Sequence, residues 1–329
     1  MRIPPVLTNH LALAAITAII VLAAACGADS SPPGAPGSIQ VGAKPWSVAL
    51  DEERGILYAG NEFDNTVSIV AMESGEVIGV VDSGTGPGAI AVDPQTGFAF
   101  VANAFINDVT VLDGTDVVFT VGVGLQPWDV AVGGGGRVFV ANSGDGTVSV
   151  LDTETLGVMN TFEGFQEPWG VAVSAGGESL YVADAATDEI LRVDPDDGTI
   201  LARGSTGERP RGIALDEPSG RLYVANTETA NVSVLSLFDL TPIATVEVGL
   251  APLAVAVNPT QSQVYVANSL ADEMSVIDSL SNTVVATVPA GRKPWDVVVS
   301  DDGELIYVAA SASGEILVFS ADRLLIEAE

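Results

Sequence analysis

The sequence predicts an all-β protein, a seven-bladed β-propeller built of four-stranded antiparallel blades. Prolines recur at nearly equal steps along the chain, at Pro45, Pro87, Pro127, Pro168, Pro210, Pro252 and Pro294. A short apolar segment follows each proline, and an aromatic residue then stands at a nearly constant distance from that proline. A repeat of this period is typical of propeller blades, in which each copy forms one sheet.

Residues 1–25 differ in kind from the repeats and indicate an export signal. Arg2 supplies a positive start, and residues 11–25 form an uninterrupted run of small and aliphatic side chains. A helix that spans a bilayer needs roughly 18 to 20 apolar residues, and this run is shorter. We therefore expect residues 1–25 to direct export rather than to remain in a membrane.

Cys26 follows this run and is the single cysteine, so no disulfide can form within the chain. Residues 22–26, LAAAC, resemble the lipobox of bacterial lipoproteins, whose cysteine is lipid-modified and becomes the mature N-terminus. The lipobox prefers Leu where this chain has Ala23, and Ala23-x-Ala25 also fits an ordinary signal-peptidase site. A lipoprotein of the cell envelope anchored through Cys26 is expected, with plain secretion as the alternative. Residues 26–38 are expected to form a flexible tether rich in Pro, Ser and Gly.

Each repeat supplies the strands of a blade in order. The proline-led segments, such as WSVAL and WDVAV, are nearly apolar on both faces, as expected for an innermost strand between neighbours. A turn follows, and the aromatic residue then opens the second strand. The third strand alternates with period two, as in Val232-Ser233-Val234, and a more polar fourth strand ends the copy. The aromatic residues are Tyr58, Phe100, Phe139, Tyr181, Tyr223, Tyr265 and Tyr307.

Closure of the ring requires a terminal strand at the outer edge of the seventh blade. Residues 39–42 stand at the same distance before Pro45 as residues 246–249, the end of a fourth strand, stand before Pro252. We therefore expect the N-terminal segment to supply this outer strand. Residues 324–327 compete for it by their spacing from Phe319. Both ends are expected to meet in the seventh blade, and the propeller to span residues 39–329.

The second strands carry a recurring four-residue unit: YAGN, FVAN, FVAN, YVAD, YVAN, YVAN and YVAA. These units resemble those of the YVTN-repeat β-propeller family of bacterial and archaeal surface and exported proteins, over residues 39–320. The resemblance implies the fold and implies little about activity, because a propeller can host many functions. Asp184 and Ala310 replace the asparagine, so the hydrogen bond of that residue is not required in every blade.

Composition excludes several kinds of chemistry. The net charge of −31 disfavours nucleic acid as a partner, because binding it normally requires a basic surface. The one histidine, His10, lies in the export signal, so histidine bases, triads and multi-histidine metal sites are not expected in the mature protein. Membrane contact is expected only through a lipid on Cys26.

Carboxylate-rich loops are the remaining candidates for metal chemistry. Residues 184–189, 194–198 and 301–303 offer oxygen ligands for calcium, but none matches a complete calcium loop. Asp and Gly also form such turns without a metal. We therefore assign no catalytic residue, no metal ligand and no cofactor, and calcium stays open.

The proline-led loops carry the candidate ligand-binding residues. In a propeller, the loop that enters the first strand and the loop that joins the second to the third lie on one face, at the mouth of the central channel. All four tryptophans and five of the 12 basic residues lie at the prolines: Lys44, Trp46, Trp128, Trp169, Arg209, Arg211, Arg292, Lys293 and Trp295.

Two interpretations of these residues stay open. Indole rings and cations suit an anionic or sugar-like ligand. Alternatively, the tryptophans pack across blade junctions and the basic groups balance acidic turns. Asp129 and Asp296, which each follow a tryptophan, either line the channel or cap the loop.

These observations favour a non-enzymatic, extracytoplasmic binding scaffold that engages a protein, peptide or glycan partner through the channel-mouth face. The alternative is a hydrolase or lactonase of the propeller type, which would use carboxylates with or without calcium. A third hypothesis is structural packing in a cell-envelope layer.

Overall fold

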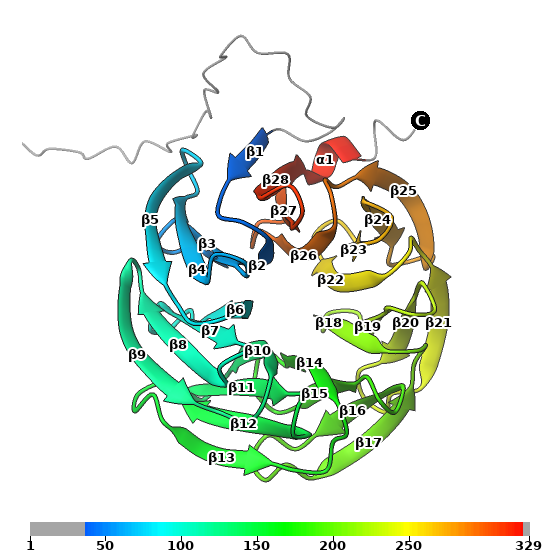
Figure 1. Cartoon of the computed structure of the whole chain (residues 1–329). Coiled ribbons are helices and arrows are strands. Elements are labelled where there is room, and N and C mark those ends of the chain that lie inside the picture. Colours follow the sequence, from blue (N-terminus) through cyan, green and yellow to red (C-terminus); the bar gives the residue numbers. More distant parts are fainter. Residues whose placement is uncertain (1–36, 325–329) are drawn as a thin grey trace, which may run out of the picture. The chain divides into compact units, whose positions relative to one another are not determined.

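A computed structural model describes residues 37–324 and confirms the predicted fold. These residues form seven four-stranded antiparallel sheets. Figure 1 shows the sheets arranged as blades around a central channel, with the proline-led strands innermost. The expected export signal, Cys26 and most of the expected tether lie outside the described residues.

The first four blades follow the chain from the channel outward. Blade 1 has β2 (Pro45–Asp51), β3 (Ile56–Asn61), β4 (Thr66–Ala71) and β5 (Glu76–Asp82). Blade 2 has β6 (Pro87–Val92), β7 (Phe98–Asn103), β8 (Asp108–Asp113) and β9 (Asp116–Gly122). Blade 3 has β10 (Pro127–Gly133), β11 (Arg137–Asn142), β12 (Thr147–Asp152) and β13 (Val158–Phe162). Blade 4 has β14 (Pro168–Val173), β15 (Leu180–Asp184), β16 (Glu189–Val193) and β17 (Ile200–Ser205).

The remaining blades repeat this order, except at the outer edge of the last one. Blade 5 has β18 (Pro210–Asp216), β19 (Arg221–Asn226), β20 (Asn231–Ser236) and β21 (Pro242–Glu247). Blade 6 has β22 (Pro252–Asn258), β23 (Gln263–Asn268), β24 (Glu273–Asp278) and β25 (Thr283–Pro289). Blade 7 has β26 (Pro294–Val299), β27 (Leu305–Ala310), β28 (Glu315–Ser320) and, from the N-terminal side, β1 (Gly37–Gln40).

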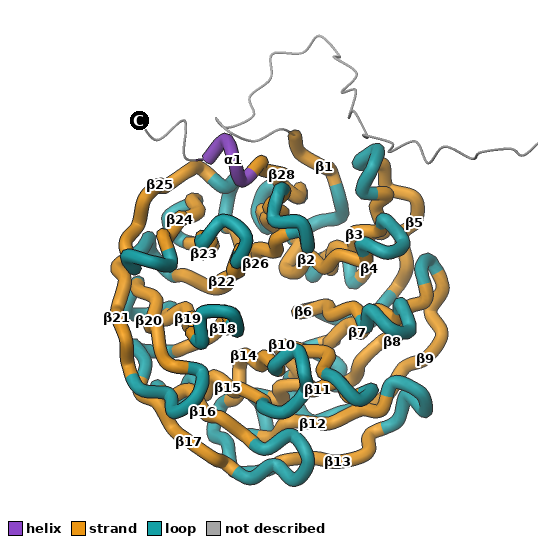
Figure 2. Tube along the Cα trace, turned by 180° about the vertical axis from the view of Figure 1, so that it is seen from behind, coloured by secondary structure: helices purple, strands orange, loops and turns teal. Residues whose placement is uncertain are grey.

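Strand β1 closes the ring, as expected for the N-terminal strand. It pairs with β28 in antiparallel register, with Ile39 opposite Ile316, and begins at Gly37, inside the segment expected as a tether. The competing C-terminal residue Leu324 instead ends a short helix, α1 (Ala321–Leu324), which packs against β28. Figures 1 and 2 both show β1 and α1 beside β28. Both described ends therefore meet at blade 7.

The hydrophobic core is divided among the junctions between blades. Seven buried clusters each combine residues of two adjacent blades, including blades 7 and 1. The repeated aromatic residue of the second strand contributes one buried ring to each cluster; Tyr58, for example, packs with Ile90 of blade 2. Each blade thus buries its faces only against its neighbours, which is why the array must close.

The asparagine that ends five of the second strands ties the channel-mouth turn to the third strand. In blade 1, Nδ2 of Asn61 donates to Oγ1 of Thr66 at 3.1 Å and to Oγ of Ser68 at 2.9 Å. In blade 4, Asp184 acts differently, because its carboxylate accepts the backbone N–H groups of Gln166 and Glu167 at 2.7 and 3.0 Å. Both arrangements hold the loops that surround the channel mouth.

Candidate functional site

A β-bulge at the start of every inner strand determines which side chain enters the channel. In blade 1 the ladder between β2 and β3 skips Trp46, which lies between the paired residues Pro45 and Ser47. A register shift follows the first proline in the other six inner strands as well. Because a bulge re-aims the side chain of the extra residue, the repeat presents one variable residue per blade at the channel.

The bulge residues line a single cavity of about 200 Å³ in the channel: Trp46, Gly88, Trp128, Trp169, Arg211, Leu253 and Trp295. All four tryptophans and one of the five predicted basic residues therefore come together. The other four basic residues, Lys44, Arg209, Arg292 and Lys293, do not line this cavity.

The four indoles form two stacked pairs. Trp46 and Trp295 stack with ring centroids 4.6 Å apart and an interplanar angle of 11°. Trp128 and Trp169 stack at 4.6 Å and 13°. The pairs meet between Trp46 and Trp128, at 5.6 Å and 40°, across blade 2, where Gly88 has no side chain to separate them. Each pair joins adjacent blades, so the indoles both pack across junctions and line the cavity.

Phe105 extends this aromatic group and was not predicted from the sequence. Its ring lies edge-on to Trp46 at 6.3 Å and to Trp128 at 6.0 Å, and the residue is 49% exposed. It stands in the turn between β7 and β8, where Phe63 occupies the corresponding place in blade 1 and is 66% exposed. The available signal was an aromatic residue two positions after the asparagine, in a turn that otherwise favours polar residues.

Arg211 is the basic residue of the cavity. Its guanidinium carbon lies 4.0 Å from the centroid of the Trp169 ring, within the range of a cation–π interaction. Its Nε is buried and has no hydrogen-bond partner among residues 37–324. Burial, with a smaller contribution from the charge of Arg209, lowers the pKa of Arg211 to about 10. The side chain is therefore protonated at neutral pH.

Asp129 and Asp296 follow the bulge in blades 3 and 7, and each bridges two blades. One carboxylate oxygen accepts the N–H of the next residue, and the other accepts an N–H from the inner strand of the next blade. The donors are Val130 and Val171 for Asp129, both at 2.9 Å, and Val297 and Val48 for Asp296, at 2.8 and 3.0 Å.

Both carboxyl groups also line the cavity, so the two roles considered for them coexist. Burial raises the pKa of Asp129 to about 7, against the lowering effect of its two backbone hydrogen bonds. Burial likewise raises the pKa of Asp296 to about 6. The desolvation free energy of each carboxylate in the channel therefore exceeds the stabilisation that its backbone hydrogen bonds provide.

Two of the four remaining predicted basic residues form ion pairs with acidic neighbours. Lys44 lies 3.4 Å from Glu62, with its ammonium 5.3 Å from the Phe63 ring centroid. Arg209 pairs with Glu167 at 2.5 Å and with Glu228 at 3.6 Å. Arg292 and Lys293 are exposed and form no ion pair within the described part of the chain.

The acidic loops considered for calcium use their carboxylates in hydrogen bonds and ion pairs with the chain itself, both within their own turns and with other segments. Asp194 accepts the backbone N–H of Asp196 at 2.9 Å, and Asp302 accepts the Ser300 hydroxyl at 2.6 Å. Within residues 37–324, no group of three or more His, Cys, Asp or Glu side chains is arranged to hold a metal ion. No helix in that range is long and apolar enough to cross a membrane.

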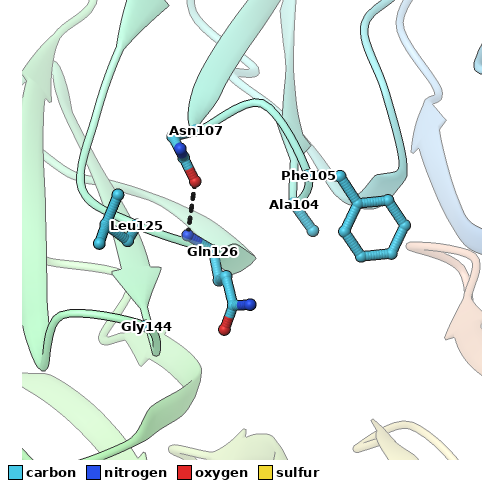
Figure 3. Close-up of a pocket in the computed structure, with 6 residues that line it drawn as sticks. All are labelled: Ala104, Phe105, Asn107, Leu125, Gln126 and Gly144. Carbon is cyan, nitrogen blue, oxygen red and sulfur yellow. Dashed lines mark hydrogen bonds between the residues drawn. The ribbon is translucent and has the colours of Figure 1, made fainter.

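A second hollow of about 380 Å³ lies on the channel-mouth face, between the turns of blades 2 and 3. Figure 3 shows Phe105 on one side of it and Leu125 on the other, with Gln126 between them. The backbone N–H of Gln126 donates to Oδ1 of Asn107 at 2.9 Å, which holds the two loops together. This hollow was not predictable from the sequence, because it forms only where two loops from different blades meet.

These observations define a β-propeller repeat protein with an aromatic cavity that contains one arginine. No protein-family model matches the chain, and no curated protein matches it. Among solved structures, it is similar to hydrazine synthase from Kuenenia stuttgartiensis, with a TM-score of 0.73 and 19% identity, over 91% of this chain and 100% of that chain. At this identity the similarity shows the propeller fold alone.

Proposed function

We propose that this protein is a non-enzymatic, extracytoplasmic binding scaffold that engages a protein, peptide or glycan through its channel-mouth face. One observation carries the proposal: all four tryptophans and Arg211 converge on one cavity through a bulge repeated in every blade. The fold alone does not require tryptophan at a bulge, since blades 2 and 6 carry Gly88 and Leu253 there. Large aromatic residues and arginine are the side chains most enriched at binding hot spots.

Exposed apolar residues around the same mouth support the proposal. Phe63, Leu250 and Leu270 are 66%, 61% and 67% exposed, and all three lie in the two sets of loops that surround the channel mouth. Exposed apolar side chains gathered beside a cavity are typical of interaction surfaces. The partner would therefore cover the rim while a part of it enters the channel.

Membership of the YVTN-repeat family, export and lipidation of Cys26 belong to this proposal. They are supported by the repeated Tyr-Val-x-Asn units and by the apolar run ahead of the cysteine. The intact mass of the protein recovered from its native membrane fraction tests the last point. A mature chain that starts at Cys26 with acyl groups attached is expected, and an unmodified thiol there would favour secretion.

Affinity capture with two variants tests the binding face. The Trp46→Ala, Trp295→Ala double variant removes one stacked pair, and Leu280→Ala removes a 75% exposed side chain from the opposite face. We expect wild type and Leu280→Ala to retain the same envelope peptides, proteins or glycans, and the double variant to lose them. Equal capture by all three would contradict the proposal.

A hydrolase is the second candidate, favoured by the raised pKa values of Asp129 and Asp296 in the cavity. Both oxygens of each carboxylate accept hydrogen bonds from backbone N–H groups, so the link between blades explains the presence of both aspartates without catalysis. Elemental analysis and a chromogenic lactone assay separate the candidates. Stoichiometric calcium, or lactone hydrolysis lost in Asp129→Asn, would favour the enzyme.

A further inference from the structure

Arg211 differs from the other partly buried arginines in the interactions of its guanidinium group. Several arginines have a carboxylate partner: Arg54 with Asp113 at 2.9 Å, Arg137 with Asp196 at 2.6 Å, Arg203 with Glu189 at 2.7 Å and Arg209 with Glu167 at 2.5 Å. None of the ion pairs among residues 37–324 includes Arg211. Arg192 and Arg221 are also partly buried without a carboxylate partner, but their guanidinium groups donate hydrogen bonds to oxygens of the chain, such as the carbonyls of Phe238 and Ser279. The side chain of Arg211 makes neither an ion pair nor a hydrogen bond within residues 37–324, which is costly for a partly buried cation.

The surrounding structure holds this cation in place. The Trp169 ring supports the guanidinium at 4.0 Å, and the bulge of β18 directs the side chain to the cavity. Blade 4 approaches so closely that a side chain at Gly170 would collide with the backbone carbonyl of Arg211. The buried Nε has no hydrogen-bond partner within residues 37–324, and the guanidinium lines the cavity without a hydrogen bond to that part of the chain, so its N–H groups that face the cavity are free for a ligand.

The size and charge of the cavity limit what this ligand can be. At about 200 Å³ the cavity is smaller than the sites that enclose drug-sized molecules, so it fits a small molecule or a chain terminus. Asp129 and Asp296 line the same cavity and oppose a multiply charged anion. A planar, singly charged carboxylate matches the arginine fork and lies flat against an indole.

We propose that Arg211 and Trp169 form a binding site for a single carboxylate group in the channel cavity. The guanidinium donates hydrogen bonds to the carboxylate oxygens, and the apolar part of the ligand contacts the indoles. The inference rests on the proposed function, for which it names the ligand chemistry. A free small carboxylate and the C-terminus of a peptide both supply this group.

Intrinsic fluorescence tests the site directly, because all four tryptophans of the chain line the cavity. The probes are propionate, inorganic phosphate, and one tripeptide with either a free or an amidated C-terminus, at constant ionic strength. We expect a saturable change with propionate or with the free tripeptide, a weaker response to phosphate and none with the amidated tripeptide. Whether propionate or the tripeptide binds more tightly identifies the source of the carboxylate.

Variants assign the response to Arg211. Arg211→Leu should weaken the dissociation constant by about tenfold to a hundredfold, because it removes charge-assisted hydrogen bonds. Arg211→Lys keeps the charge without the planar fork and should give an intermediate value. Arg323→Leu removes an exposed charge from α1, outside the channel-mouth loops, and should leave the titration unchanged. Melting temperatures of all variants confirm that each is folded.

Two outcomes would overturn the inference: no saturable response to any probe, or equal affinities in wild type and Arg211→Leu. Its failure is distinguishable from failure of the proposed function. If capture of the partner depends on Trp46 and Trp295 but not on Arg211, the binding face stands and the carboxylate site does not. If the double variant captures normally and the titration depends on Arg211, the reverse holds.

Discussion

The asparagine of the Tyr-Val-x-Asn unit packs against a glycine in the loop that precedes the inner strand. Any side chain on that glycine would overlap the asparagine. Six of the seven repeats place glycine at the third position before the proline. A Cβ added to Gly124 would lie 2.7 Å from Cγ of Asn142, and the same conflict arises in four more repeats. In blade 4, Asp184 replaces the asparagine and Phe165 replaces the glycine. The two positions are therefore linked by packing, although they belong to different loops.

Replacing Gly124 with Ala should destabilise the propeller by about 1–3 kcal/mol, because the added methyl group overlaps a buried amide. Urea unfolding followed by circular dichroism measures the change. Gly122→Ala is the matched control, since a Cβ there meets no atom within 4 Å. Equal stability of the two variants would show that the loop shifts without cost.

The buried carboxyl group of Asp129 predicts a dependence of stability on pH. Its pKa is raised to about 7, so the folded state binds a proton more tightly than the unfolded chain. The resulting stabilisation is fully present below the unfolded pKa of about 3.9 and is lost as the pH rises through about 7. The free energy of unfolding should therefore fall between pH 5 and pH 8.

Asp129→Asn isolates this contribution from the rest of the acidic chain. The variant should show a smaller fall in unfolding free energy between pH 5 and pH 8 than the wild type. Asp197→Asn serves as the control, because hydrogen bonds from Thr199 lower the pKa of this surface carboxyl. If Asp129→Asn and wild type lose stability in parallel over this range, the carboxyl group does not titrate as expected.

Strand β1 is the element on which closure of the ring depends. Its residues lie opposite residues 315–318 of β28, and Ile39 packs against the cluster between blades 7 and 1. Without it, β28 would present an open edge and Ile316 would lose a covering neighbour. This short strand is therefore the outermost strand of blade 7, a position that every other blade fills with a strand from its own repeat.

A chain that begins at Val41 should melt at a lower temperature than the wild type and aggregate more readily. Amide hydrogen exchange should also accelerate in β28, at residues 315–318. A chain that begins at Gly37 keeps β1 and provides the matched control. Equal melting temperatures and exchange rates for the two truncations would show that β1 contributes nothing to closure.

The charge of the whole chain opposes its compact state. With 43 acidic and 12 basic residues, the net charge of −31 generates repulsion that salt screens. The melting temperature at pH 8 should rise when sodium chloride is raised from about 0.01 M to about 0.5 M, since the Debye length falls from roughly 30 Å to roughly 4 Å. Calorimetry at several concentrations measures this, and a decrease would indicate that ion pairs outweigh the repulsion.

The fold was predictable from the sequence because each blade repeats the same local requirements. The prolines, the buried aromatic residues and the period-two third strands each recur once per blade, so the positions of the inner strands followed directly. The start of β1 at Gly37 was harder to predict, because Gly37 and Ser38 belong by composition to a Pro- and Gly-rich segment. Pairing with β28, at the opposite end of the chain, extends the strand into it.

The candidate site was predictable only as a set of loops. The sequence placed the four tryptophans on one face, but it did not show which of them stack, nor that the two pairs meet across Gly88, where Trp46 contacts Trp128. The basic residues could not be ranked in advance, because only contacts between blades show that Arg209 is paired and Arg211 is not. Contacts between side chains of different repeats cannot be recognised from the local sequence around either residue.

The position of β1 also determines how the propeller would bear mechanical load. A force applied to the chain ahead of Gly37, as at an anchored N-terminus, reaches the ring through β1 and its pairing with β28. Tension along the strand would shear these hydrogen bonds together, whereas tension across it would break them one after another. The ladder between β1 and β28 in blade 7 would thus bear the load first, and the direction of pull would decide how readily β1 leaves the blade.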